Sequence, residues 1–331
     1  MKLSSTRSGT NPRLAALLMG VCAALAGASA AAQEYPAREI RAICSFAAGS
    51  GGDILVRYYS DKLAKLSGRP VIVENRAGAL GVIGTDYAAK AKPDGYTILV
   101  APISSTLAAA PYIFKKLPYD PLKDFAAVAP VSSLNFVVAV AGTSPIKNIA
   151  ELTTYLKSKA DHGSYGIANN TGQVAGEVFK EMAGLKSVMI PYTTTAPAVT
   201  DLVGGRLDYV VSDATFMTSQ ARAGRVRILA VTGAKRSAAL PDVPTMAEAG
   251  FKGYDISAWW GVVVPAGTPK PIIQRLAGWL AQINATEETR KFLQNVSTDV
   301  LNGTPEAMAE MVKRDNERWS RYTKIAHIQA Q

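Results

Sequence analysis

A glycine-rich turn that carries hydroxyl and carboxylate side chains runs from Ser45 to Asp53 (SFAAGSGGD). An apolar, strand-like run precedes it at residues 40–43, and an apolar, helix-like run follows it at residues 54–66. Glycines let the backbone approach a ligand closely, and the first amide N–H groups of a helix have no partner within that helix. Together with the positive end of the helix dipole, these amides attract an anion. The sequence therefore predicts an anion-binding turn at residues 45–53.

Four more polar turns follow strand-like segments, at residues 104–106, 169–172, 193–195 and 212–213. Ligands of an open α/β sheet lie outside the carboxyl ends of its strands, so we expect these turns to face the same site. The candidate ligand-binding residues are Phe46, Ala47, Gly49, Asp53, Ser104, Ser105, Asn169, Asn170, Thr171, Thr193 and Asp213. The polar members of this set have an ordinary alternative role as helix caps or first-turn acids.

Strand-like and helix-like segments alternate along almost the whole chain. The predicted strands are 40–43, 71–73, 96–101, 136–141, 165–168, 188–190, 209–211, 228–231 and 262–264. The predicted helices include 54–66, 81–91, 149–160, 173–183, 271–283 and 305–324, and Thr245 and Glu248 have the spacing of a capping box. This alternation is typical of an α/β fold with a mainly parallel sheet and helices on both faces.

Catalytic and metal-binding patterns are sparse. The two histidines, His162 and His327, are not near a strand-end turn, so a Ser–His–Asp or Cys–His triad is not expected. Cys44 lies in a strand-like run and is expected to be a buried apolar residue. No zinc, calcium or P-loop spacing occurs, and aromatic residues are not interleaved with Lys and Arg as in a nucleic-acid groove. One enzymatic alternative stays open, a mechanism that uses Asp53 and Asp213 as paired carboxylates.

Residues 1–32 have the pattern of a secretory signal peptide. Lys2, Arg7 and Arg13 form a basic start, an alanine-rich apolar run follows at residues 14–28, and small residues end it. The alternative is a membrane anchor, for which the run is short. Cleavage near residues 30–32 would lower the formal net charge from +10 to +7, because the removed segment holds those three basic residues and no acidic one. We expect an exported, mildly basic protein that attracts anions.

Eight motifs, in order, resemble one family, the periplasmic solute-binding proteins of tripartite tricarboxylate transporters, also called Bug proteins. They are residues 45–53 (SFAAGSGGD), 73–78 (VENRAG), 93–97 (PDGYT), 116–121 (KLPYDP), 196–198 (APA), 201–205 (DLVGG), 240–245 (LPDVPT) and 265–269 (PAGTP). The chain departs from the family pattern at Ser45, which replaces a usual proline, at Ser50, which replaces a usual glycine, and at Thr193, which replaces a usual lysine.

The resemblance implies a type II-like periplasmic binding protein fold, with two α/β domains and a ligand cleft between them. The expected limits are 33–135 plus 259–331 for domain 1 and 136–258 for domain 2. It implies no catalysis and a small carboxylate held by backbone amides, hydroxyls and ordered water. No cofactor and no metal are expected.

The implied partners are the membrane subunits of a tripartite tricarboxylate transporter or a sensor kinase. A monomer is expected, with no nucleic-acid partner. The leading hypothesis is thus a periplasmic carboxylate-binding protein, and the alternative is a secreted hydrolase or isomerase that uses paired aspartates.

Overall fold

The computed structural model describes residues 35–159 and 161–330. The predicted signal peptide, residues 1–32, lies outside the described residues. The strands are β1 (Ile40–Cys44), β2 (Val71–Asn75), β3 (Thr97–Ala101), β4 (Phe125–Ala141), β5 (Ser164–Ile167), β6 (Val188–Pro191), β7 (Tyr209–Asp213), β8 (Val226–Val231), β9 (Ser257–Pro265) and β10 (Asp299–Val300). The helices are α2 (Gly51–Ser67), η1 (Ala79–Gly81), α3 (Val82–Ala89), η2 (Ser104–Ala109), α4 (Ala110–Ile113), α5 (Ile149–Ser158), α6 (Asn170–Ala183), α7 (Thr195–Val203), α8 (Ala214–Arg222), α9 (Lys270–Asn284), α10 (Glu287–Asn295) and α11 (Pro305–Ile325).

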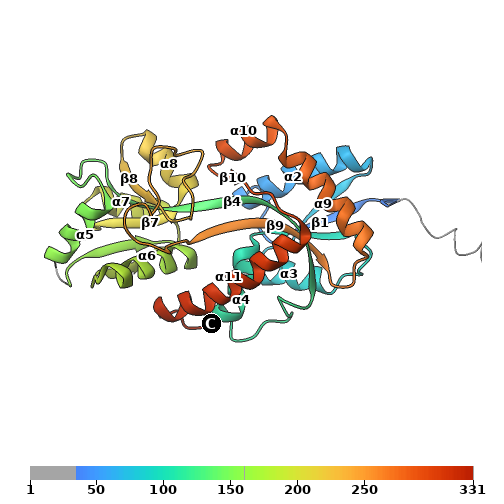
Figure 1. The fold of residues 1–331 in the computed structure, drawn as a ribbon, viewed down its shortest axis with the longest axis horizontal. Helices are drawn as coiled ribbons and strands as arrows, with labels where there is room; N and C mark the ends of the chain where they lie inside the picture. Colours follow the sequence, from blue (N-terminus) through green and yellow to red (C-terminus); the bar gives the residue numbers. More distant parts are fainter. Residues whose placement is uncertain (1–34, 160, 331) are drawn as a thin grey trace, which may run out of the picture.

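The strands pair in two sets that share the long strand β4 (Figure 1). The first strand set has the order β2-β1-β3-β9-β4, with β10 also paired to β4. The second has the order β4-β7-β5-β6, with β8 also paired to β4. Residues 125–135 of β4 pair with β9, and residues 136–141 pair with β7 and β8. Strands β4 and β9 therefore run side by side and join the two groups of elements.

The prediction of a mainly parallel sheet was wrong, because the sheet is mixed. The pairs β1–β2, β1–β3, β5–β6 and β5–β7 are parallel, as strand–helix–strand units require. Strand β9 is antiparallel to β3, and β4 is antiparallel to β7, β8, β9 and β10. The reason is that β4 and β9 carry the chain from one strand set to the other and back, and so run against their neighbours.

Helices cover both faces of both strand sets, as predicted. In the first set, α2 and α9 pack on one face through residues such as Val56 and Leu280, and α3, η2 and α11 pack on the other. In the second set, α5 and α6 cover one face, and α7 and α8 cover the other. The last turns of α11 join the second set, because Trp319, Tyr322 and Ala326 belong to the same buried cluster as α6. Helix α11 thus packs against both groups of elements (Figure 1).

Two local predictions need correction. The predicted helix at 81–91 is instead the one-turn helix η1 followed by the shorter α3. Thr245 and Glu248 do make the reciprocal hydrogen bonds of a capping box. The segment that follows Thr245, residues 246–250, consists of turns rather than a helix. By contrast, Cys44 is buried, as expected. Both histidines are exposed.

Within residues 35–159 and 161–330, no helix combines the length and apolar character needed to cross a membrane. The same residues contain no cluster of three or more His, Cys, Asp or Glu side chains that could hold a metal ion.

Candidate functional site

A cleft of about 670 Å³ lies where turns from the two strand sets meet. The first strand set, with the helices that follow it, contributes Ser45, Phe46, Ala47, Ala77, Gly78, Leu80, Gly81, Pro102, Ser105, Ile113 and Phe114. The second contributes Phe136, Ala168, Asn169, Asn170, Thr171, Tyr192 and Thr193, and α11 contributes Trp319. Seven of the predicted site residues line this cleft: Phe46, Ala47, Ser105, Asn169, Asn170, Thr171 and Thr193.

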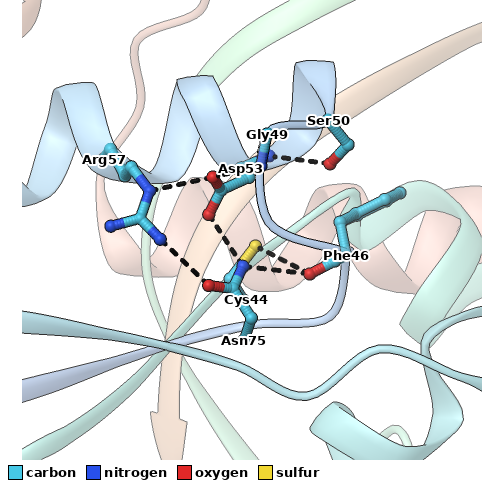
Figure 2. A network of polar contacts seen from close by, with 7 residues as sticks. All are labelled: Cys44, Phe46, Gly49, Ser50, Asp53, Arg57 and Asn75. Atoms are coloured by element: carbon cyan, nitrogen blue, oxygen red, sulfur yellow. Dashed lines mark hydrogen bonds and ion pairs between the residues drawn. The ribbon is translucent and has the colours of Figure 1, made fainter.

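Asp53 does not line the cleft; its carboxylate organises the turn behind it (Figure 2). The side chain is buried, at 2% exposure. Its Oδ2 accepts hydrogen bonds from the Gly49 amide and from Arg57 Nε, both at 2.8 Å, and its Oδ1 accepts one from Asn75 Nδ2 at 2.7 Å. The hydrogen bond from Arg57 is the main cause that lowers the pKa of Asp53 to about 2, against the opposing effect of burial. Asp53 is therefore ionised and fully engaged within the turn.

Asn75 ties the same turn to β2. Its Nδ2 also donates to the carbonyl oxygen of Phe46 at 3.0 Å, and its Oδ1 accepts from Arg57 Nη2 at 3.0 Å. The amides of Phe46 and Ala47 donate to no other described residue. The network therefore fixes the turn while leaving two backbone donors at the cleft without a partner.

Gly52 lets the start of α2 approach this turn. A Cβ at position 52 would lie 2.7 Å from the ring of Phe46, which is closer than carbon atoms can pack. Phe46 in turn packs on Trp260 of β9, with 5.3 Å between ring centroids. The predicted residue Gly49 adopts a left-handed φ of 80° and faces Asp53 rather than the cleft.

The second strand set presents the amino-terminal ends of α6 and α7 to the cleft. Asn169 caps α6, because its Oδ1 accepts from the Gly172 amide at 2.8 Å. The amides of Asn170 and Thr171 have no acceptor among the described residues, as expected for the first turn of a helix. Thr194 begins α7 without a side-chain cap. These ends bring positive helix dipole and free N–H groups to the wall that faces Phe46 and Ala47.

Ser104 and Asp213 have structural partners instead of lining the cleft. The Oγ of Ser104, 1% exposed, accepts a hydrogen bond from the Trp259 amide at 3.1 Å and so attaches η2 to β9. Asp213 caps α8 through its Oδ1, which accepts from the Phe216 amide at 3.0 Å. Asp53 and Asp213 are thus each used at the start of a separate helix. Neither lines the cleft, so the geometry gives no support to a paired-aspartate mechanism.

The apolar wall of the cleft was missed by the sequence analysis. It consists of Leu80, Ile113, Phe114, Phe136 and Trp319. The glycines at 78 and 81 flank Leu80 and could have marked a close turn. No local sequence pattern predicted that Trp319 lines the cleft, because its position depends on how α11 packs across both groups of elements.

Sequence comparison places the chain in a family. Residues 55–327 match the family model described as the tripartite tricarboxylate transporter family receptor. The chain belongs to this receptor family. Members are periplasmic solute-binding proteins rather than enzymes, as the resemblance implied, which removes the hydrolase or isomerase alternative.

Solved structures of family members share the fold. The periplasmic binding protein BugD is 34% identical, with a TM-score of 0.71 over 90% of this chain and 100% of that one. Rpa4515 of R. palustris, solved with adipate, is 29% identical, with a TM-score of 0.75 over 90% of this chain and 100% of that one. MatC of Rhodopseudomonas palustris, solved with bound malate, is 28% identical, with a TM-score of 0.70 over 87% of this chain and 99% of that one. The α/β periplasmic binding protein fold predicted from the sequence is confirmed.

Proposed function

We propose that this receptor binds a small carboxylate in the cleft between its two strand sets and delivers it to the membrane subunits of a tripartite tricarboxylate transporter. The observation that carries the proposal is the pairing of free backbone donors on opposite walls, at residues 46–47 and 170–171. An anion at the start of a helix gains about 0.3–1 kcal/mol from the dipole, and up to about 2 kcal/mol when partly buried. The adipate and malate bound by two relatives support a carboxylate as the ligand class.

The domain limits belong to the same proposal. Strand β4 changes partners between Asn135 and Phe136, and β9 begins at Ser257. These two positions support domain 1 as 33–135 plus 259–331 and domain 2 as 136–258, with β4 and β9 as the connections. We also propose export, with cleavage near residues 30–32, and a monomeric receptor.

A thermal-shift screen of carboxylates tests the proposal. A ligand that binds only the folded state at about 100 times its Kd adds about 2.7 kcal/mol of stability, which raises the Tm by roughly 5 °C for a chain of this size. The matched control for each acid is its neutral amide, which keeps the shape and removes the charge. Stabilisation by at least one acid but not by its amide is expected. If no acid in a broad panel stabilises the protein more than its amide does, the proposal is contradicted.

A further inference from the structure

The cleft contains no charged side chain. None of its lining residues is Asp, Glu, Lys, Arg or His among those that the structure describes. Three cations adjoin lining residues in the sequence without lining the cleft themselves: Arg76, Lys115 and Arg318. Arg76 pairs with Glu74 at 3.2 Å, Arg318 pairs with Asp255 at 2.7 Å, and Lys115 is exposed. Any carboxylate that enters must therefore be held by amides and hydroxyls alone, because burying an uncompensated charge is costly.

Free donors of the cleft lie on the turns at residues 45–47 and 169–171, at Thr193, and on the segment 77–80, where the amides of Ala77, Gly78 and Leu80 have no acceptor among the described residues. Ser45 belongs to this polar part, and its hydroxyl is buried, at 4% exposure, without a hydrogen-bond partner among the described residues. A ligand or water that reaches this hydroxyl would satisfy it. The polar part therefore offers donors for a carboxylate.

The remaining wall is apolar and aromatic. Ile113 and Phe114 come from the end of α4, and Trp319 comes from α11, which packs beside α4 (Figure 1). Phe136 of β4 and the exposed Leu80 extend this wall. These side chains carry no charge and offer a single N–H, that of the Trp319 indole, so a second carboxylate placed against them would lose most of its hydrogen bonds to water without replacement.

We infer that the ligand of this receptor is a monocarboxylate with a bulky apolar body, such as an aromatic or alicyclic acid, rather than a dicarboxylate. The inference rests on the proposed function, because it assumes that an acid occupies this cleft. The carboxylate lies at the polar turns, and the body lies against the apolar wall, in contact with Leu80, Phe136 and Trp319. The cleft volume of about 670 Å³ is ample for such a body.

Isothermal titration of the purified protein with four acids tests the inference. Hexanoate and adipate form a matched pair, since a terminal methyl group in one replaces a carboxylate in the other. Phenylacetate and malate extend the comparison. Hexanoate and phenylacetate should bind at least about tenfold more tightly than adipate. Adipate binding as tightly as hexanoate, or more tightly, would overturn the inference and leave the proposed function standing. Binding of none of the four acids would overturn the inference, and the thermal-shift panel would then decide the proposed function.

Leu80→Ala provides a second test that does not threaten the fold. Leu80 is 70% exposed, so its side chain adds little to the core. The substitution should weaken phenylacetate binding about tenfold, leave adipate binding within twofold and leave Tm unchanged. Leu66→Ala is the matched control, because Leu66 is also exposed, at 41%, and lies on α2 outside the cleft. An unchanged Kd for phenylacetate in Leu80→Ala would overturn the inference.

Discussion

At the scale of single residues, Asp53 was predicted to contact the ligand, but in the structure it holds the ligand-binding turn in position. The sequence left two roles open, a ligand contact and a first-turn acid. Three donors surround its carboxylate in the structure, from Gly49, Arg57 and Asn75, and it lies behind the cleft. Its effect on binding is therefore indirect, through the position of the turn.

The pH dependence of stability should report this role. The pKa of Asp53 is lowered to about 2 in the folded state, mainly by the hydrogen bond from Arg57, whereas an unfolded Asp has a pKa of about 3.9. Its stabilisation is therefore present above pH 4 and is lost as the pH falls through about 2. Asp53→Asn should lower the free energy of unfolding by about 1–3 kcal/mol at pH 7 and flatten its fall between pH 4 and 2.

Urea unfolding at several pH values measures this effect. Asp61→Asn is the matched control, because Asp61 lies on the same helix in an exposed pair with Lys65 and should contribute under about 1 kcal/mol. Equal pH profiles for the protein and Asp53→Asn would contradict the account of the turn.

Two buried serines should respond in opposite directions to the same change. Ser45 has a hydroxyl without a partner, whereas the hydroxyl of Ser104 accepts a hydrogen bond from the Trp259 amide. Ser45→Ala should leave the stability of the empty protein unchanged or raise it by up to about 1 kcal/mol. Ser104→Ala should lower it by about 1–3 kcal/mol, because a buried donor loses its acceptor. Thermal or urea unfolding distinguishes the two, and a loss of equal size in both would contradict this assignment.

At the scale of elements, the sequence was most informative where the signal is local. Asn148 and Thr304 directly precede the predicted helices 149–160 and 305–324, and both cap them by accepting hydrogen bonds from the amides of Glu151 and Ala307. The first half of β4 was missed because Pro130 breaks the strand pattern. The strand tolerates it because the register with β9 shifts at Ala127–Ala129 and again at Pro130–Ser132.

The position of α6 relative to β7 can be tested with a matched pair of glycines. A Cβ on Gly172 would lie 2.8 Å from the carbonyl oxygen of Val211, so the start of α6 must shift to accept it. Gly172→Ala should cost about 1–3 kcal/mol and weaken ligand binding. Gly278 lies inside α9 with open space around it, and Gly278→Ala should instead stabilise the protein by up to about 1 kcal/mol. Calorimetric unfolding of both variants measures whether each substitution lowers or raises the stability. A Gly172→Ala variant that is more stable than the protein would contradict the packing of α6 against β7.

At the scale of the whole molecule, the site depends on contacts that no local pattern contains. The turns at 45–47 and 169–171 are distant in sequence and meet because β4 and β9 connect the two strand sets. The apolar wall is completed by α11, which packs against both groups of elements. The alternation of elements predicted the fold class and the polar turns. It could not predict the antiparallel crossing strands or Trp319 in the cleft.

The central claim is that backbone donors on opposite walls hold a carboxylate in an uncharged cleft. A crystal structure of the protein with its tightest-binding acid tests it most directly. The account predicts the carboxylate within hydrogen-bond distance of the amides at residues 46–47 and 170–171, with no Lys or Arg side chain in contact. An acid held by a cation, or bound outside this cleft, would contradict the account.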